Sequence, residues 1–242
     1  KPVIRGLGFN RVAVVDKGIV QQSQQWGADH GLEIDQYDVD NVSIHKGPMS
    51  LLYGSDAIGG VVEILPSSPP KDNGFWGDVS LIGKSNNDLL GTSVSANIKQ
   101  NKWLLKARFT TQYYGDYRIP ADTIVYLTWQ MPVEKRRMKN TAGREHNASF
   151  SATYNSDKLA WTLYLSDIYA KNGFFPGSHG IPDLSRLRDD GSYRNIEMPY
   201  STVNHFKAIS NTALSFDKGK LMLDVGVQQN DRRELSKFHT HY

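Results

Sequence analysis

The sequence predicts a small mixed α/β domain followed by antiparallel β-strands of the kind that form a transmembrane barrel. Three observations support this fold class. Residues 41–65 have the pattern strand, turn, short helix, glycine-rich loop, strand. From Gly74 onward, segments of about ten residues alternate apolar and polar side chains. The connections between these segments include both short polar turns and long loops, as is typical of barrels that cross a membrane.

Composition narrows the class of protein. The chain has 242 residues, enough for one or two domains, and its 39% hydrophobic and 11% aromatic content suits a β-rich protein whose strands are half polar. The absence of cysteine excludes disulfides and thiolate metal sites. A net charge of +3 gives no electrostatic argument for nucleic-acid binding. No run of about 18 apolar residues predicts a membrane-spanning helix.

The first domain is expected to begin with a buried strand at Val12–Val15. Residues 21–30 are polar and predict an exposed loop. Residues 35–39 predict a short helical turn that leads into the next strand. These elements precede residues 41–65, the segment around which the domain is organised.

Within residues 41–65, Val42 and Ile44 alternate with polar neighbours and predict a half-buried strand. The turn signal Gly47-Pro48 precedes a short apolar helical surface. The glycines that follow are expected to provide a left-handed helix cap and a close approach of backbone. These glycines are Gly54, Gly59 and Gly60.

A proline- and serine-rich linker at residues 66–73 places the domain boundary, so the first domain covers residues 1–70 and the strands lie in residues 71–242. Seven alternating segments are expected there, beginning near Phe75, Val94, Trp103, Ala148, Leu159, Ala208 and Leu221. Short turns are predicted at 100–102, 155–158 and 217–220, and long loops at 114–146 and 170–204.

Residues 41–65 resemble the plug domain of TonB-dependent outer-membrane receptors. The family pattern is similar to V-x-V-x-K-G-P-x-S-x-L-Y-G-x-x-A-I-G-G-V-V-N-I, from which this sequence departs at Glu63. A second segment, Ile4-Arg5-Gly6, resembles the I-R-G part of the same domain. The motif positions are Arg5, Gly6, Lys46, Gly47, Pro48, Tyr53, Gly54, Gly59 and Gly60. The resemblance covers about the first quarter of the chain.

The resemblance implies active import of a scarce nutrient across the outer membrane, with TonB as the energy-coupling partner and outer-membrane lipid around the barrel. Barrels of this family have 22 strands, so about seven would form part of the wall. The short turns would lie on the periplasmic side, and the motif glycines would let the plug pass close to the wall. The chain starts at Lys1 without a signal peptide, so we expect a fragment or a processed chain that lacks the TonB-contacting segment.

Histidines and a carboxylate suggest a metal as cargo. Asp29 and His30 form a partial ligand set for Zn²⁺ or a similar ion in the polar loop, and His239 and His241 share one face of a terminal strand. His179 and His205 are expected in a long loop on the same side. The alternative is that these side chains are solvated. The expected substrate is zinc, haem or a ferric siderophore. No resident cofactor is expected beyond the transported metal or chelate.

The charged residues outside this set are expected to have structural roles more than ligand-binding roles. Arg5, Lys46 and Glu63 are expected to face the barrel interior, where charges hold the plug to the wall. Basic residues in the long loops would either steer an anionic chelate or be solvated, the second being favoured. These residues are Lys135, Arg136, Arg137, Arg186 and Arg188.

The sequence predicts no enzyme, because it lacks a G-x-S-x-G element, an H-E-x-x-H element and a phosphate-binding loop. Other functions stay open. One is a passive pore or a surface-binding protein. Another is TonB-dependent uptake of a non-metal ligand such as an oligosaccharide or cobalamin. A soluble β-rich binding domain would need a second sheet to cover the apolar faces.

Overall fold

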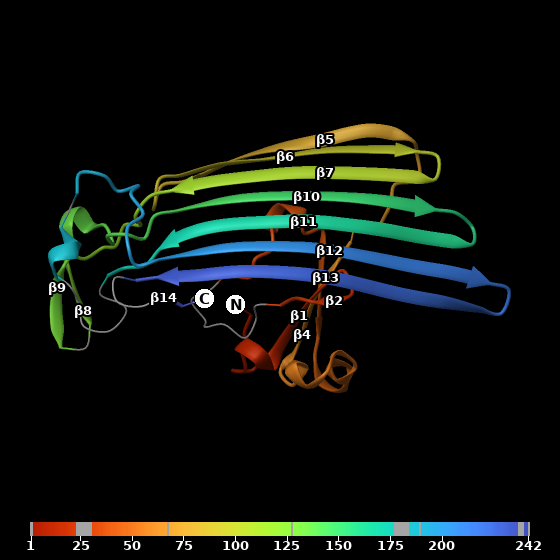
Figure 1. The fold of residues 1–242 in the computed structure, drawn as a ribbon, viewed down its shortest axis with the longest axis horizontal. Helices are drawn as coiled ribbons and strands as arrows, with labels where there is room; N and C mark the ends of the chain where they lie inside the picture. Colours follow the sequence, from red (N-terminus) through yellow and green to blue (C-terminus); the bar gives the residue numbers. More distant parts are fainter. Residues whose placement is uncertain are drawn as a thin grey trace.

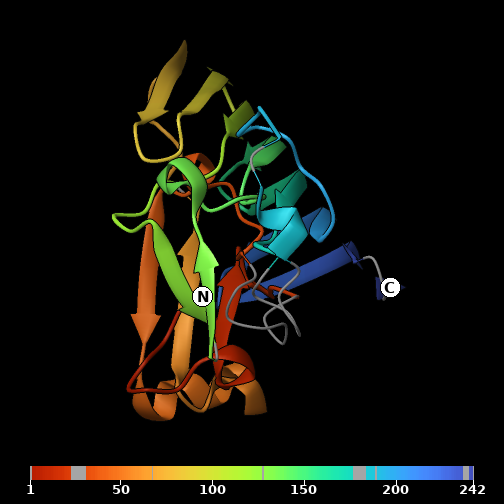
Figure 2. The ribbon, with the colours of Figure 1, turned by 90° about the vertical axis from the view of Figure 1, so that its left-hand side faces the viewer.

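The computed structural model describes residues 2–22, 31–66, 68–126, 128–176, 184–188, 190–236 and 240–241. Two sheets dominate it: that of an N-terminal domain, residues 2–66, and a long antiparallel sheet, here called the large sheet (Figure 1). The large sheet curves around the N-terminal domain (Figure 2). Among the described residues, no helix is both long enough and apolar enough to cross a membrane.

The N-terminal domain is built on a four-stranded sheet in the order β2-β1-β4-β3. Strand β1 (Val12–Asp16) runs parallel to β4 (Gly60–Leu65), and β2 (Ile19–Val20) and β3 (Asn41–His45) pair antiparallel at the edges. All five residues of β1 are buried, which confirms the expected strand. Val42 and Ile44 alternate as predicted, but both are more than half exposed, at 54% and 58%, so the expectation of a half-buried strand does not hold for its apolar face.

The two predicted helical turns are the 3₁₀ helices η2 (Gln36–Asp38) and η3 (Gly47–Tyr53). Two further 3₁₀ helices, η1 (Phe9–Arg11) and η4 (Ser55–Ala57), were not predicted. Gly54 ends η3 with φ 95° and ψ −175°, so it has the positive φ expected of it but not the left-handed helical conformation. The reason is that η4 begins at the next residue, and the chain must turn sharply between two short helices.

Gly59 and Gly60 provide the predicted close approach, but to a different partner. A Cβ at Gly59 would lie 2.8 Å from the carbonyl oxygen of Arg11, and one at Gly60 would lie 2.8 Å from Ile4 Cδ1. Both contacts are internal to the N-terminal domain, so the expectation that these glycines pass close to the barrel wall is wrong for the described contacts. They allow β4 to pack closely against residues near the start of the chain.

The large sheet has eight strands in the order β14-β13-β12-β11-β10-β7-β6-β5. Its long strands are β5 (Gly74–Lys84), β6 (Leu89–Gln100), β7 (Trp103–Tyr114), β10 (Gly143–Asn155), β11 (Leu159–Gly173), β12 (Tyr200–Phe216) and β13 (Gly219–Leu235). These are the predicted seven, and β14 (Thr240–His241) adds a short edge. The first long loop also contains a hairpin, β8 (Thr123–Tyr126) and β9 (Trp129–Pro132), followed by η5 (Glu134–Arg136). The second contains η6 (Leu184–Leu187).

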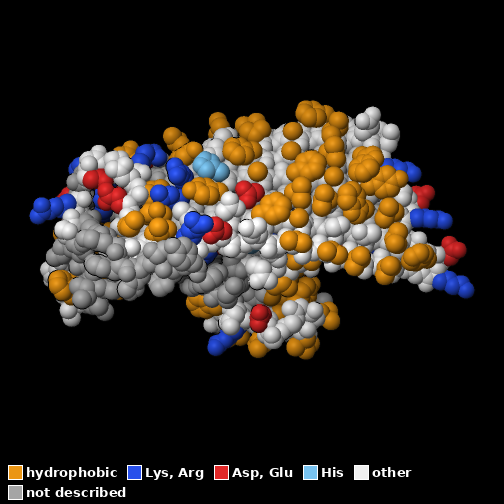
Figure 3. All heavy atoms as spheres, viewed as in Figure 1, with side chains coloured by type: hydrophobic (Ala, Val, Ile, Leu, Met, Phe, Trp, Pro, Cys, Tyr) orange, Lys and Arg blue, Asp and Glu red, His pale blue; other side chains and the backbone are white. Residues whose placement is uncertain are grey.

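The two faces of the large sheet differ as the alternation predicts. The outer face, turned away from the N-terminal domain, is covered with exposed apolar side chains (Figure 3). The inner face carries buried polar side chains, such as Ser93 and Thr110, whose hydroxyl oxygens are 2.8 Å apart. An apolar outer face and a polar inner face are the arrangement of a barrel wall in lipid.

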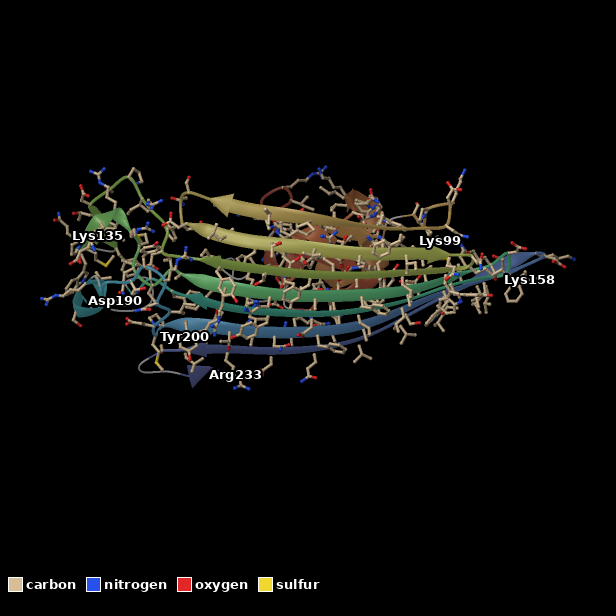
Figure 4. The ribbon with its side chains drawn as sticks, turned by 90° about the horizontal axis from the view of Figure 1, so that it is seen from above. Lys99, Lys135, Lys158, Asp190, Tyr200 and Arg233 are labelled. Atoms are coloured by element: carbon tan, nitrogen blue, oxygen red, sulfur yellow. The ribbon has the colours of Figure 1, made fainter. Side chains whose placement is uncertain are left out.

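The two ends of the large sheet also differ. The turn end has the short connections 101–102, 156–158 and 217–218, and the loop end has 85–88, 115–142 and 174–199. In Figure 4, Lys99 and Lys158 mark the turn end, and Lys135 and Asp190 mark the loop end. At the loop end, Asn140 binds both long loops together, because its side-chain nitrogen donates to the carbonyl oxygens of Phe174, Glu197 and Pro199.

Candidate functional site: a polar lock between two cavities

A cluster of polar side chains joins the N-terminal domain to the inner face of the large sheet. We call this cluster the polar lock. It consists of Asp16, Gln21 and Glu33 from the N-terminal domain and His205, Lys207 and Arg232 from the large sheet. Strands β12 and β13 position the sheet residues, because every second side chain of a strand points to the same face.

The first half of the polar lock is an ion pair. The Lys207 ammonium group donates to the carboxylate of Asp16 and, at 3.0 Å, to the side-chain oxygen of Gln21. Both charged side chains are almost fully buried, with 4% and 5% of their surface exposed. Lys17 lies 3.2 Å from the same carboxylate. A buried charge of this kind is tolerated only when it is paired.

The second half is centred on Glu33. Its carboxylate accepts a hydrogen bond from His205 Nδ1 at 2.7 Å and from the side chains of Asn230 and Arg232. His205 is fully buried on β12. The contacts therefore hold the described segment that begins at residue 31 against the inner face of the large sheet.

Next to the polar lock, the β1–β2 turn approaches the sheet closely. A Cβ at Gly18 would lie 3.2 Å from Asp224 Oδ2, and one at Gly226 would lie 2.8 Å from Ile19. The side-chain nitrogen of Asn211 also donates to the carbonyl oxygen of Lys17 at 3.1 Å. These glycines, and not those of the motif, let the N-terminal domain reach the sheet.

The pKa values of the two carboxyls follow from their partners. Burial by itself would raise the pKa of Asp16, but Lys207 and Lys17 outweigh burial and lower it. For Glu33, burial is likewise outweighed, by the hydrogen bond from His205 and by the charge of Arg232, so its pKa is also lowered. Both groups are therefore charged at neutral pH.

On the loop side of the polar lock lies a cleft of about 430 Å³, here called the loop-end cleft. It lies between residues 31–36 and the loop-end halves of the strands of the large sheet. Polar groups of several kinds line it, among them Tyr114, Glu145 and Asn147. The side-chain oxygen of Asn147 is buried and has no hydrogen-bond partner among the described residues. The cleft is thus lined by groups that can bind a polar ligand.

On the other side of the polar lock lies a turn-end cavity of about 390 Å³. Its lining includes Lys17, Asp38 and Arg108, and Asp16 and Lys207 border it. The polar lock therefore separates two hollow regions along the inner face of the sheet.

The predicted metal ligands are not tested by these contacts. Asp29, His30 and His239 lie outside the described residues, and for His241 the structure describes the backbone of β14 and not the side chain. Within the described part of the chain, no group of three His, Asp or Glu side chains could hold a metal ion. The metal site formed by these four residues stays a prediction.

Two further structural predictions need correction. His205 was expected in a long loop, but β12 begins at Tyr200 and places it on the inner face, in the polar lock. Glu63 was expected to hold the plug to the wall, but it pairs with His45 of the adjacent strand β3 at 2.7 Å. Ser43 and Glu63 face each other in the β3–β4 register, so His45 lies diagonally across from Glu63. The two long side chains are therefore within reach of each other.

The remaining motif residues form turns of the N-terminal domain. Arg5 and Gly6 have positive φ angles of 51° and 78° in a turn closed by hydrogen bonds between Ile4 and Leu7. Arg5 and Lys46 are exposed. The Tyr53 ring stacks on His45 with 5.9 Å between ring centroids.

The basic loop residues make ion pairs at the loop end. Arg136 pairs with Asp122 at 2.8 Å, and Arg137 pairs with Asp88 at 2.6 Å. Arg137 also lies over the ring of Tyr193, 4.2 Å from its centroid. Arg137 therefore ties three loops together, and the expectation that it is merely solvated is wrong. Arg136 pairs within its own loop and stays 60% exposed, as the solvated interpretation expects.

The sequence reasoning missed Asp16, Glu33, Lys207 and Arg232. A signal for one of them, Lys207, was present. Lys207 lies two residues after His205, and the alternate positions Phe206 and Ala208 are apolar, so His205 and Lys207 had to face the polar interior. Their partners could not be read from the sequence, because Glu33 lies 172 residues before His205.

The lowered pKa of Glu33 predicts an acid-sensitive polar lock. A carboxyl whose pKa is lower in the folded protein stabilises it above its ordinary pKa, 4.5 for glutamate, and loses that contribution as the pH falls further. We expect hydrogen exchange of residues 31–36 to accelerate as the pH falls below about 4.5, after correction for intrinsic exchange. Glu33→Gln should remove this part of the pH dependence. An identical pH profile in wild type and Glu33→Gln would contradict the assignment.

Comparison with known proteins gives sequence matches to this chain. Residues 1–61 match the family model described as TonB-dependent Receptor Plug Domain. The iron-regulated outer membrane virulence protein of Vibrio cholerae serotype O1 is 37% identical over 86 residues, which cover 32% of this chain and 13% of that protein.

Two solved structures share the fold. The siderophore receptor PirA from Acinetobacter baumannii matches 96% of this chain with a TM-score of 0.67 and 13% identity. PirA from Pseudomonas aeruginosa matches 96% with a TM-score of 0.58 and 13% identity. The chain spans 34% of each of these receptors. The comparison therefore identifies an N-terminal domain of the plug type with a partial barrel wall.

Proposed function

We propose that this chain, whose N-terminal domain is a TonB-dependent receptor plug domain, serves in the active uptake of a ferric siderophore across the outer membrane. The observation that carries the proposal is the polar lock, which holds that domain between two hollow regions of the inner face. The names of the similar proteins, an iron-regulated outer membrane protein and two siderophore receptors, support the outer membrane as its location and iron as its cargo.

The loop-end cleft is the proposed binding region. Its volume of about 430 Å³ is within the usual range for small-molecule sites, about 300–1,000 Å³. Its carboxylate, hydroxyl and amide groups suit a polar chelate that offers both donors and acceptors. The ferric chelate is the substrate here and not a resident cofactor.

TonB is the proposed source of the work that opens the path. A domain held by hydrogen bonds and ion pairs can move because water replaces each broken contact. Pulling on the N-terminal domain from the turn end would break the polar lock and join the two hollow regions. The polar inner face would then conduct a hydrated solute.

Growth and uptake test the cargo. A deletion strain should fail to grow on the cognate ferric siderophore as its only iron source, and should grow normally on haem or with limiting zinc. Uptake of radiolabelled ferric siderophore should disappear in a strain without TonB. Growth loss only on haem or zinc would replace the siderophore by those cargoes, and uptake without TonB would indicate a passive pore.

The cleft is tested by a matched pair of substitutions. Asn147→Leu removes a buried amide from the loop-end cleft, and we expect siderophore affinity to fall about tenfold, the usual cost of a lost hydrogen bond to a buried group. Asn97→Leu removes a similar amide from the turn-end cavity and should leave affinity unchanged. Affinity is measured by fluorescence titration of the intact protein. Equal losses, or no loss, in both variants would remove the loop-end cleft from the site.

A further inference from the structure

Two carboxylates line the loop-end cleft, one from each part of the protein. Asp35 belongs to the N-terminal domain, where it caps η2 by accepting a hydrogen bond from the backbone nitrogen of Tyr37 at 3.0 Å. Glu145 lies on β10 of the large sheet. The two carboxylates are close enough for their charges to repel each other. Like charges brought together across a contact destabilise that contact unless a positive charge lies beside them.

The described lining of the cleft has three carboxylates and two cations, so its charge is net negative. Arg232 is bound to Glu33 in the polar lock. Lys84 acts on Glu145, but it is exposed at the end of β5, where water and salt screen its charge. The hydroxyl of Tyr114 is a hydrogen-bond partner of Glu145 and brings no charge. The cleft therefore retains an uncompensated negative charge.

Two amide oxygens make the same cleft rich in hydrogen-bond acceptors. The Oδ1 atoms of Asn87 and Asn147 are buried and have no hydrogen-bond partner among the described residues. Asn147 is 5% exposed and lies two residues after Glu145, so both side chains are on the inner face of β10. Asn87 lies in the short connection between β5 and β6. A buried acceptor without a donor is costly, and a ligand that supplies donors removes this cost.

We propose that the loop-end cleft binds an ammonium group of the transported ferric chelate, beside Asp35 and Glu145. An ammonium group has a positive charge, three donors and no acceptor, so it matches carboxylate and amide oxygens. A free metal ion fits less well, because no three His, Asp or Glu side chains of the described residues come together as its ligands. The ammonium assignment rests on the siderophore uptake proposed above, and it adds that the chelate carries a primary amine.

The test compares two ferric chelates that differ in one charge. Ferrioxamine B is a ferric trihydroxamate that ends in a primary amine, and acetylation of this amine removes the charge while the metal complex stays the same. The affinity of the intact protein in detergent for each chelate is measured by fluorescence titration. A charge-assisted hydrogen bond to a buried group contributes roughly tenfold to a hundredfold in affinity, so the acetylated form should bind more weakly by that factor.

Two single substitutions connect this preference to the cleft. Asp35→Asn preserves the cap of η2, because asparagine is an equally good N-cap residue, and Glu145→Gln preserves the length of the side chain. Each should reduce the ratio of the two affinities roughly tenfold. The control is Asp40→Asn, which removes a carboxylate that lines the turn-end cavity and not the loop-end cleft, and which should retain the wild-type ratio. Thermal unfolding in detergent shows whether each variant is folded.

Three results would overturn the ammonium assignment while the protein still binds a ferric chelate. The first is equal affinity of the wild-type protein for ferrioxamine B and its acetylated form. The second is an unchanged affinity ratio in both Asp35→Asn and Glu145→Gln. The third is displacement of ferrioxamine B by an equal concentration of Ca²⁺, which would show a site for free metal ions.

A failure of the uptake proposal gives a different result. If neither form of ferrioxamine B binds, the ammonium assignment is overturned, and growth of the deletion strain then decides the function. Loss of growth on another ferric siderophore would leave siderophore uptake intact. Normal growth on every ferric siderophore supplied would overturn the proposed function as well.

Discussion

Lys207→Met should destabilise the docking of the N-terminal domain by about 3 kcal/mol, because it leaves the buried carboxylate of Asp16 without its main partner. The expected readout is hydrogen exchange of the β1 amides in the intact protein, which should accelerate by roughly a hundredfold or more. The double variant Asp16→Asn/Lys207→Met should recover a large part of the loss, since it buries no unpaired charge.

A second ion pair between the same two parts of the protein supplies the control. Lys106 of β7 lies 3.5 Å from Asp40, and their side chains are 31% and 50% exposed. Lys106→Met should therefore cost less than about 1 kcal/mol, as exposed ion pairs do. If the two lysine variants have equal effects, the polar lock is not the contact that holds the N-terminal domain.

Gly60→Ala should destabilise the N-terminal domain by about 2–4 kcal/mol, the sum of backbone strain and overpacking. Gly60 has φ 139°, and a Cβ there would lie 2.8 Å from Ile4 Cδ1 and 2.9 Å from the carbonyl oxygen of His45. The exchange rates of the β1 and β4 amides should rise together, because the two strands are paired.

Gly31→Ala is the matched control. A Cβ at Gly31 would meet nothing within 4 Å among the described atoms, and its φ lies outside the strained range. We expect a change below about 0.5 kcal/mol, as for other surface substitutions. A Gly60→Ala protein with wild-type exchange rates would mean that β4 can move away from Ile4 and His45 without loss of packing.

The sequence predicted the strands well because their signal is local. Alternation at Phe75, Trp103 and Leu221 follows from the two-residue period of a strand, which puts every second side chain in lipid. Loop bounds were less accurate. The expected loop 170–204 ends in the structure at residue 199, because residues 200–204, which are mostly polar and were expected in the loop, form the first part of β12.

The type of helix could not be predicted from the sequence either. The apolar residues of Gly47–Tyr53 fit either an α-helix or a 3₁₀ helix over such a short length. Gly54 follows η3 directly and η4 begins at residue 55, and the segment adopts the tighter 3₁₀ form. Gly59 and Gly60 were correctly assigned to a close approach of backbone, but the sequence could not show that their neighbours include Ile4, Arg11 and His45.

The sequence by itself determined that this protein has a glycine-bearing N-terminal domain and strands with one apolar and one polar face. Those features depend on the chemistry of residues a few positions apart. Only the tertiary structure decided which inner-face residues touch that domain. Asp16 and Lys207 are 191 residues apart, and Glu33 and Arg232 are 199 residues apart. Their pairing depends on how the large sheet curves around the N-terminal domain, which places β12 and β13 beside β1, and no local pattern encodes that distance.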